Sequence, residues 1–385
     1  MSVWDELVGQ DEAVARLRAA ASGTGDGAAM THAWLLTGPP GSGRSNAARA
    51  FAAALLSEDH GEAMSPAAAR ALSGTHESMT IMSTQKSLIT IDEVRELVSQ
   101  AQSAPVNAPW RVMIIEDADR MAERTSNVLL KAIEEPPPAT VWILCAPSPQ
   151  DVLMTIRSRC RNVNLRIPPA QAIASLLVSR DGVDEARAEW AAAAAQNHIG
   201  RARFLATNEE AAQQRERTLE IPDRLTSVGS TVRLAARTLD AATERAEART
   251  KERNARERAA LLATLGVEPG KTPPPALRSQ VKRLEEEQKR KDSRARGDEL
   301  DAMLLELLSL YRDVLLCQFG VDGGWINAHD DARIRTIAGQ TDAPTTLKRI
   351  DVLSQARRRL QTNTPPLLVL ESAFIGLSNP WLSAD

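Results

Sequence analysis

Uninterrupted apolar runs alternate with amphipathic stretches over the first 165 residues of the chain. Three of the runs are long enough for buried strands, and they lie at residues 32–38, 111–115 and 140–146. Runs without polar interruption are typical of parallel strands that helices cover on both faces. The alternation of strands and helices therefore predicts an α/β domain with a parallel sheet over residues 1–166.

Helical spacing fills the intervals between these strands. Apolar residues recur every three or four positions over residues 91–98, and Thr90 and Glu93 at their start form the pattern of a capping box. A helix is also expected over residues 45–56, directly after the first strand. Three consecutive prolines end another helix, which carries residues 128–135.

The remainder of the chain is helical in pattern. The pattern predicts a small helical unit over residues 167–207 and a larger all-α region over residues 208–385. Within the larger region, residues 241–297 are rich in Glu, Arg, Lys and Ala, and the segment VEPGKTPPP at 267–275 interrupts them. This pattern predicts a charged helical hairpin, which is either solvated or a partner-binding arm. The apolar residues 300–310 predict a helix that packs in a bundle.

Composition places the chain among globular proteins. Of its 385 residues, 43% are apolar and 25% are charged, which suits two or three domains with substantial cores. The formal net charge is -3, which argues against a protein that holds nucleic acid through a broadly basic surface. A local basic stripe remains compatible with this charge.

The cysteines and the N-terminus indicate a compartment. Cys145, Cys160 and Cys317 lie far apart, and their spacing suits neither a zinc site nor a disulfide framework. The N-terminus is acidic and amphipathic, and no apolar run is long enough to cross a bilayer. We therefore expect a cytoplasmic protein with no zinc and no membrane contact.

A phosphate-binding loop pattern follows the first predicted strand. Its candidate nucleotide ligands are Gly38, Pro39, Pro40, Gly41, Ser42, Gly43, Arg44 and Ser45. A Gly-rich turn between a strand and a helix directs backbone N–H groups at a polyphosphate. The Ser45 hydroxyl would contact Mg²⁺, and the cation at position 44 would reach the β- and γ-phosphates. Arg44 replaces the usual lysine, so ATP or ADP binding stays compatible with the pattern, but placement for catalysis is more fragile.

Two acids, Glu116 and Asp117, follow the second predicted strand. In an active ATPase of this kind the first acid is normally Asp, which organises the magnesium shell, and the second is normally Glu, which orients the attacking water. Here the order is reversed, so each carboxylate moves by about 1–1.5 Å. Because general-base catalysis depends on reach to about 3 Å, the reversal indicates weak or lost hydrolysis. Ser45 and Glu116 are expected to contact a metal only if a magnesium nucleotide binds.

Residues 126–160, with the sequence SNVLLKAIEEPPPATVWILCAPSPQDVLMTIRSRC, closely resemble the clamp-loader ATPase family of AAA+ proteins. The likeness extends to LVGQDEAVARL from Leu7, to GPPGSG in the loop and to EDADRM from Glu116. Within the family, the chain looks most like the delta-prime subunits of bacterial DNA polymerase III. The likeness is dense over the first 165 residues, and the remainder agrees in layout.

The resemblance implies an AAA+ P-loop module at 1–166, a helical lid at 167–207 and a helical collar at 208–385. It also implies a hetero-pentameric ring with tau/gamma ATPase subunits and a delta subunit, in the cytoplasm and at the nucleoid. Such a ring opens the β sliding clamp and loads it onto primed DNA during replication. Many relatives carry a four-cysteine zinc module between the loop and the acids, but residues 46–110 contain no cysteine. The charged stretch at 241–297 matches no family motif.

The same resemblance implies roles for single residues. Arg159 of the SRC motif would act in trans as an arginine finger, because its guanidinium meets the charge on the γ-phosphoryl group of a neighbouring subunit's ATP. Val8 lies in the segment that lines the adenine pocket, and Arg201 falls at the sensor arginine of the lid, with Arg203 close by. At the sensor position after the third strand, Ser148 is the polar residue that could replace the Thr or Asn of active relatives.

Three functions therefore stay open. The first is a stator-like ring subunit that hydrolyses ATP weakly or not at all and supplies Arg159 to its neighbour. The second is a competent clamp-loader ATPase of the tau/gamma type, or another AAA+ remodeller, which requires Arg44 and Asp117 to work in an altered geometry. The third is a DNA-binding repair or recombination protein that uses residues 241–297, although their mixed charge weakens this alternative.

Overall fold

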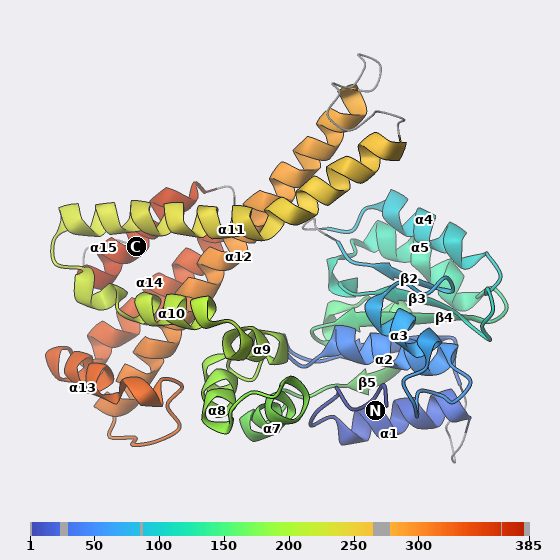
Figure 1. The fold of residues 1–385 in the computed structure, drawn as a ribbon, viewed down its shortest axis with the longest axis horizontal. Coiled ribbons are helices and arrows are strands. Elements are labelled where there is room, and N and C mark those ends of the chain that lie inside the picture. Colours follow the sequence, from blue (N-terminus) through green and yellow to red (C-terminus); the bar gives the residue numbers. More distant parts are fainter. Residues whose placement is uncertain (1, 24–29, 85–87, 265–277, 363, 381–385) are drawn as a thin grey trace. The chain divides into compact units, whose positions relative to one another are not determined.

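The computed structural model describes residues 2–23, 30–84, 88–264, 278–362 and 364–380, and these form two compact units (Figure 1). The first unit is Met1–Asn208 and the second is Glu209–Asp385. The first unit contains two apolar clusters and the second contains one. The division falls after the predicted lid, so the lid and the sheet share one unit.

A parallel five-stranded sheet organises the first unit, with the strand order β2-β3-β4-β1-β5. The strands are β1 (Ala33–Thr37), β2 (Met79–Met82), β3 (Arg111–Ile115), β4 (Thr140–Ala146) and β5 (Arg161–Asn164). The α/β class predicted from the apolar runs is thus confirmed, and the three predicted strands are the central β1, β3 and β4. The sequence pattern missed the two edge strands because each has four residues, and β5 buries only Val163.

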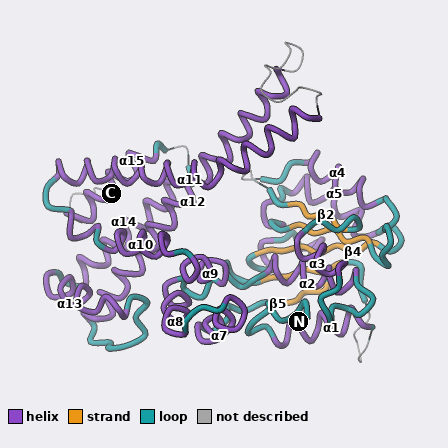
Figure 2. The backbone as a smooth tube through the Cα atoms, in the orientation of Figure 1, coloured by secondary structure: helices purple, strands orange, loops and turns teal. Residues whose placement is uncertain are grey.

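Helices cover both faces of the sheet (Figure 2). They are α1 (Asp11–Ser22), α2 (Arg44–Leu56), α3 (Pro66–Ser73), α4 (Ile91–Ala101), α5 (Glu123–Glu134) and the short α6 (Met154–Arg157). Successive strand residues point to opposite faces, so Leu36 joins the cluster that contains Phe51 of α2, while Leu35 joins the cluster that contains Leu129 of α5. The predicted capping box is confirmed at α4, where the Thr90 side chain and Glu93 satisfy each other's backbone N–H groups.

The predicted small helical unit consists of α7 (Ala170–Asp181), α8 (Glu185–Ala194) and α9 (Ile199–Thr207). Arg180 of α7 pairs with Glu6 at 3.5 Å, which connects this helical unit to the N-terminal segment. His198 directly precedes α9, and its ring Nδ1 caps the helix by accepting from the Arg201 backbone N–H at 3.3 Å. These contacts fix the N-terminus of α9 within the first unit.

The second unit is helical, as its sequence pattern predicts. It contains α10 (Glu209–Leu219), α11 (Val228–Thr264), α12 (Arg278–Gln318), α13 (Asp331–Gln340), α14 (Ala343–Leu360) and α15 (Pro366–Ser378). Leu300, Leu304 and Leu307 of α12 are fully buried, so the bundle packing expected for residues 300–310 is confirmed. Short 3₁₀ helices complete the two units: η1 (Ala118–Arg120), η2 (Pro149–Asp151), η3 (Ile221–Arg224) and η5 (Ala328–Asp330).

The distal halves of α11 and α12 lie side by side and form the predicted charged hairpin. Polar contacts join the two helices: Arg249 pairs with Glu299 at 2.9 Å, and Lys291 pairs with Glu257 at 3.2 Å. The mixed charges that suggested a solvated face therefore also link one helix to the other. The turn predicted at 267–275 lies outside the described residues. Within the described part of the chain, no helix is both long and apolar enough to span a membrane.

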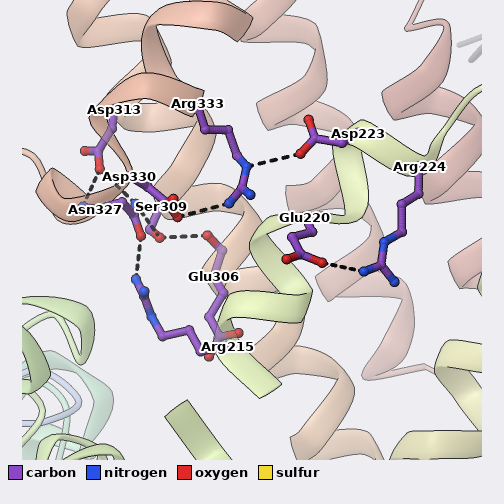
Figure 3. A network of polar contacts seen from close by, with 10 residues as sticks. All are labelled: Arg215, Glu220, Asp223, Arg224, Glu306, Ser309, Asp313, Asn327, Asp330 and Arg333. Carbon is purple, nitrogen blue, oxygen red and sulfur yellow. Dashed lines mark hydrogen bonds and ion pairs between the residues drawn. The ribbon is translucent and has the colours of Figure 1, made fainter. Parts of the chain in front are cut away.

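A buried polar network joins α10 to α12 and to the loop before α13 (Figure 3). Asp313 and Asn327 are fully buried, and the carboxylate of Asp313 accepts from the backbone and side-chain N–H groups of Asn327, both at 2.8 Å. Asn327 in turn accepts a hydrogen bond from Arg215, which is 1% exposed. Sequence analysis did not single out Arg215, because it lies in a helix of otherwise polar composition.

Candidate nucleotide-binding site

The loop from Gly38 to Gly43 joins β1 to α2, and its shape depends on glycine. Gly41 and Gly43 have positive φ angles of 89° and 84°, a region that other residues rarely adopt. A Cβ atom on Gly38 would lie only 2.5 Å from the Leu165 carbonyl oxygen. The loop exposes Pro39 and Pro40 at its tip and ends at the N-terminus of α2, where free N–H groups favour an anion.

The Arg44 side chain bends back over this loop. Its Nη1 donates to the Gly38 carbonyl oxygen at 2.7 Å, and the side chain is half-buried. Ser45 is also half-buried, in the first turn of α2, whereas Ser42 is 2% exposed. A phosphate group that enters the loop therefore meets a guanidinium that is already bonded to the loop's own backbone. Arginine keeps the positive charge of the usual lysine but adds a bond that a phosphate has to replace.

The two acids at the end of β3 are both paired with arginines. Glu116 lies 3.2 Å from the guanidinium of Arg49, and their side chains are 17% and 31% exposed. Asp117 lies 3.8 Å from Arg120 of η1. The carboxylate expected to organise a metal shell is thus neutralised by a cation from α2. Arg49 is a site residue that no sequence motif indicated, although its position four residues after Ser45 puts both on one face of α2.

Cys145 lies in β4 beside the loop, with its Sγ 3.8 Å from the Arg44 carbonyl oxygen. Burial, reinforced by the charge of Glu116, raises the pKa of the Cys145 thiol to about 12. The thiol therefore stays neutral and packs as a small apolar group.

Ser148, the candidate sensor after β4, is used locally. Its hydroxyl oxygen accepts from the Gln150 backbone N–H at 3.4 Å and caps η2. The preceding residues, Ala146 and Pro147, contribute carbonyl oxygens to the Gly38 N–H at 3.3 and 3.2 Å. The backbone at the expected sensor position thus hydrogen-bonds to the loop, and the Ser148 side chain is used to cap η2.

Gln10 connects three segments around the loop. Its side-chain amide donates to the carbonyl oxygens of Ser42 at 3.3 Å and Arg166 at 2.5 Å, and it accepts from the Arg166 N–H at 3.0 Å. Val8, the adenine-pocket candidate, is half-buried two residues earlier. Gln10 shares the LVGQDEAVARL motif with Val8, but its buried position depends on contacts with distant segments that the motif does not indicate.

The N-terminus of α9 meets the loop at Gly41. A Cβ atom on Gly41 would lie 3.3 Å from the His198 ring, so glycine allows the lid to approach this closely. Burial lowers the pKa of His198, which favours the neutral ring. Arg201 lies in the first turn of α9, whereas Arg203 pairs with Asp181 at 2.9 Å.

Arg159 lies apart from these residues in sequence, in the turn after α6, and is exposed. Its Nη1 donates to the Thr155 carbonyl oxygen at 2.8 Å, and its Nη2 lies 2.5 Å from the Glu134 carboxylate. Five and six residues earlier in the chain, Met154 and Leu153 are 74% and 37% exposed. The segment 153–159 therefore exposes both apolar side chains and a cation.

A sequence profile described as "DNA polymerase III, delta subunit" matches residues 9–169, which contain the loop, both acids and Arg159. Residues 9–169 are therefore similar to the subunits of the DNA polymerase III clamp-loader family. This confirms the family resemblance stated from the motifs.

Relatives of two subunit types are similar to this chain. DNA polymerase III subunit gamma/tau of Mycobacterium bovis is 32% identical over 184 residues, which cover 45% of this chain and 30% of the relative. DNA polymerase III subunit delta' of Pseudomonas aeruginosa is 32% identical over 154 residues, which cover 38% of this chain and 47% of the relative. The chain thus spans less than half the length of either. A gamma subunit-related structure from Thermotoga maritima is 15% identical, covers 90% of this chain and 94% of its own, and has a TM-score of 0.46.

Proposed function

We propose that the protein is a delta-prime-type clamp-loader subunit that supplies Arg159 in trans to the ATP of a neighbouring subunit. The observation that carries the proposal is the exposure of Arg159, whose side chain is 40% accessible in a turn next to exposed Met154. A guanidinium at the surface can reach a γ-phosphoryl group bound elsewhere, and stabilising its charge is the role of an arginine finger.

The protein's own site supports weak or absent hydrolysis. Arg44 is bonded to the Gly38 carbonyl, Glu116 is paired with Arg49, and the Ser148 hydroxyl caps η2. These three groups, which would otherwise act on ATP, are thus engaged by the chain itself. Hydrolysis depends on placement to within about 1 Å, so these engagements together disfavour turnover.

Nucleotide binding remains compatible with the loop geometry. The glycine positions and the N-terminus of α2 suit ATP or ADP phosphates, and Ser45 with Glu116 would hold the magnesium ion. Such an ion would neutralise phosphate charge. Arg49 would have to leave Glu116 for the carboxylate to contact it.

The proposed partners follow from the relatives, which are themselves subunits of DNA polymerase III. They are tau/gamma ATPase subunits and a delta subunit in a hetero-pentamer, together with the β sliding clamp and primed DNA. The proposed location is the cytoplasm, at the nucleoid. An alternative is a competent ATPase of the tau/gamma type, which is favoured by the equal identity of the gamma/tau and delta' relatives.

The test replaces Arg159 with alanine and measures ATP hydrolysis by the assembled loader. Hydrolysis at the neighbouring site is expected to fall by about 10³-fold, the smaller end of the effect of an arginine finger. Arg95→Ala, which removes an exposed arginine from α4, serves as the matched control and should leave the rate unchanged. An unaltered rate in the Arg159→Ala ring, or full turnover by the isolated chain, would contradict the proposal.

A further inference from the structure

Glu134 is the acidic partner of the exposed Arg159. Its carboxylate lies 2.5 Å from Nη2 of Arg159, while Nη1 donates to the Thr155 carbonyl at 2.8 Å and to the Ser158 hydroxyl at 3.4 Å. The guanidinium is thus held by three acceptors, which come from the end of α5, from α6 and from the residue directly after α6. Three acceptors fix the plane of a guanidinium, which one acceptor cannot do.

The position of Glu134 is unusual for an acid. It is the last residue of α5, where the helix dipole is negative and a carboxylate is disfavoured. Arg159 offsets that repulsion by placing its positive charge against the same helix end. The last turn of α5 already carries Lys131, and Arg159 adds a second positive charge from outside the helix, in contact with the Glu134 carboxylate.

The core fixes the two side chains relative to each other. Ile133 precedes Glu134, Ile156 lies three residues before Arg159, and both isoleucines are fully buried in one apolar cluster. The backbone at both ends of the ion pair is therefore anchored in the interior, even though the side chains are 39% and 40% exposed. Their contact does not depend on a mobile surface segment.

We infer that Glu134 is a positioning residue, which orients Arg159 toward the nucleotide of the neighbouring subunit. The inference rests on the proposed function of Arg159 in trans. An exposed ion pair contributes little to stability, so Glu134 does not compete strongly with a polyphosphate for the guanidinium. It restricts the orientations of a long side chain before the neighbour arrives, and such preorganisation lowers the entropic cost of the productive contact.

The experiment measures ATP hydrolysis by the assembled loader that contains Glu134→Ala. The kcat at the neighbouring site is expected to fall by about three- to tenfold, while the KM for ATP and the assembly of the ring stay unchanged, since only orientation is lost. Glu134→Gln keeps an oxygen acceptor and is expected to be intermediate. Glu135→Ala removes the adjacent exposed acid and serves as the matched control, with an unchanged rate.

A double variant separates the possible causes. If Glu134 acts through Arg159, Glu134→Ala adds no further loss in the Arg159→Ala background. A loss that persists there, or a rate that rises in Glu134→Ala, overturns the positioning role. If Arg159→Ala lowers the rate and Glu134→Ala does not, the inference about Glu134 fails while the trans role of Arg159 stands. If neither variant changes the rate, both fail.

Discussion

Arg44 and Asp117 are the two residues that we expect to limit ATP hydrolysis at the protein's own site. Arg44 is bonded to the Gly38 carbonyl, and Asp117 is one methylene shorter than the Glu normally found there. Lysine at position 44 presents a compact ammonium that carries fewer donors to the loop backbone. Glutamate at position 117 extends the carboxylate toward an attacking water.

We expect the combined variant Arg44→Lys with Asp117→Glu to raise ATP turnover by the chain about 10²-fold over its own background, the smaller end of a general-base contribution. The measurement is steady-state phosphate release. Arg95→Lys with Asp92→Glu, an exposed pair on α4, makes the same chemical changes away from the loop and should have no effect. If turnover does not rise, another feature of the site prevents hydrolysis, such as the use of the Ser148 hydroxyl to cap η2.

At the scale of single elements, the capping box of α4 offers a direct measurement of local stability. Thr90 accepts from the Glu93 N–H, and Glu93 accepts from the Thr90 N–H at 2.7 Å. Thr90→Ala removes one half of this exchange and is expected to lower the free energy of unfolding of the first unit by about 1 kcal/mol. Thr90→Ser keeps the acceptor and should retain most of the stability in urea unfolding. Equal stability of both variants and the natural chain would show that α4 does not need its cap.

Elements with a strong local signal could be predicted from the sequence, and elements that depend on distant partners could not. The strands β1, β3 and β4 are central and uniformly apolar, so periodicity identified them. The edge strand β5 reads RNVN and exists because β1 pairs with it. The residue pattern located the phosphate loop for the same local reason.

Side-chain partners in the site escaped prediction because they come from segments far apart in sequence. Gln10 reaches Arg166 across 156 residues, and Arg49 reaches Glu116 across 67. Neither contact leaves a periodic trace in the sequence. The sequence pattern places Arg49 in a helix, but it does not show that Arg49 pairs with Glu116. That pairing depends on how the end of β3 lies against α2. Such contacts decide whether the acids can serve a metal.

For the whole molecule, the two units are expected to fold independently. The apolar clusters of the first unit use residues up to Leu165, and the cluster of the second begins at Leu219, so each core is complete within its own unit. A piece of about 200 residues is large enough to bury a stable core. We therefore expect residues 1–208 alone to give a cooperative thermal transition within about 5 °C of one of two transitions in the full chain.

The measurement is calorimetry of the fragment and of the full chain, each with and without Thr90→Ala. The substitution should shift the transition of the first unit by a similar amount in both proteins. A fragment that shows no cooperative transition, or a cap variant that shifts every transition of the full chain, would mean that the units stabilise each other.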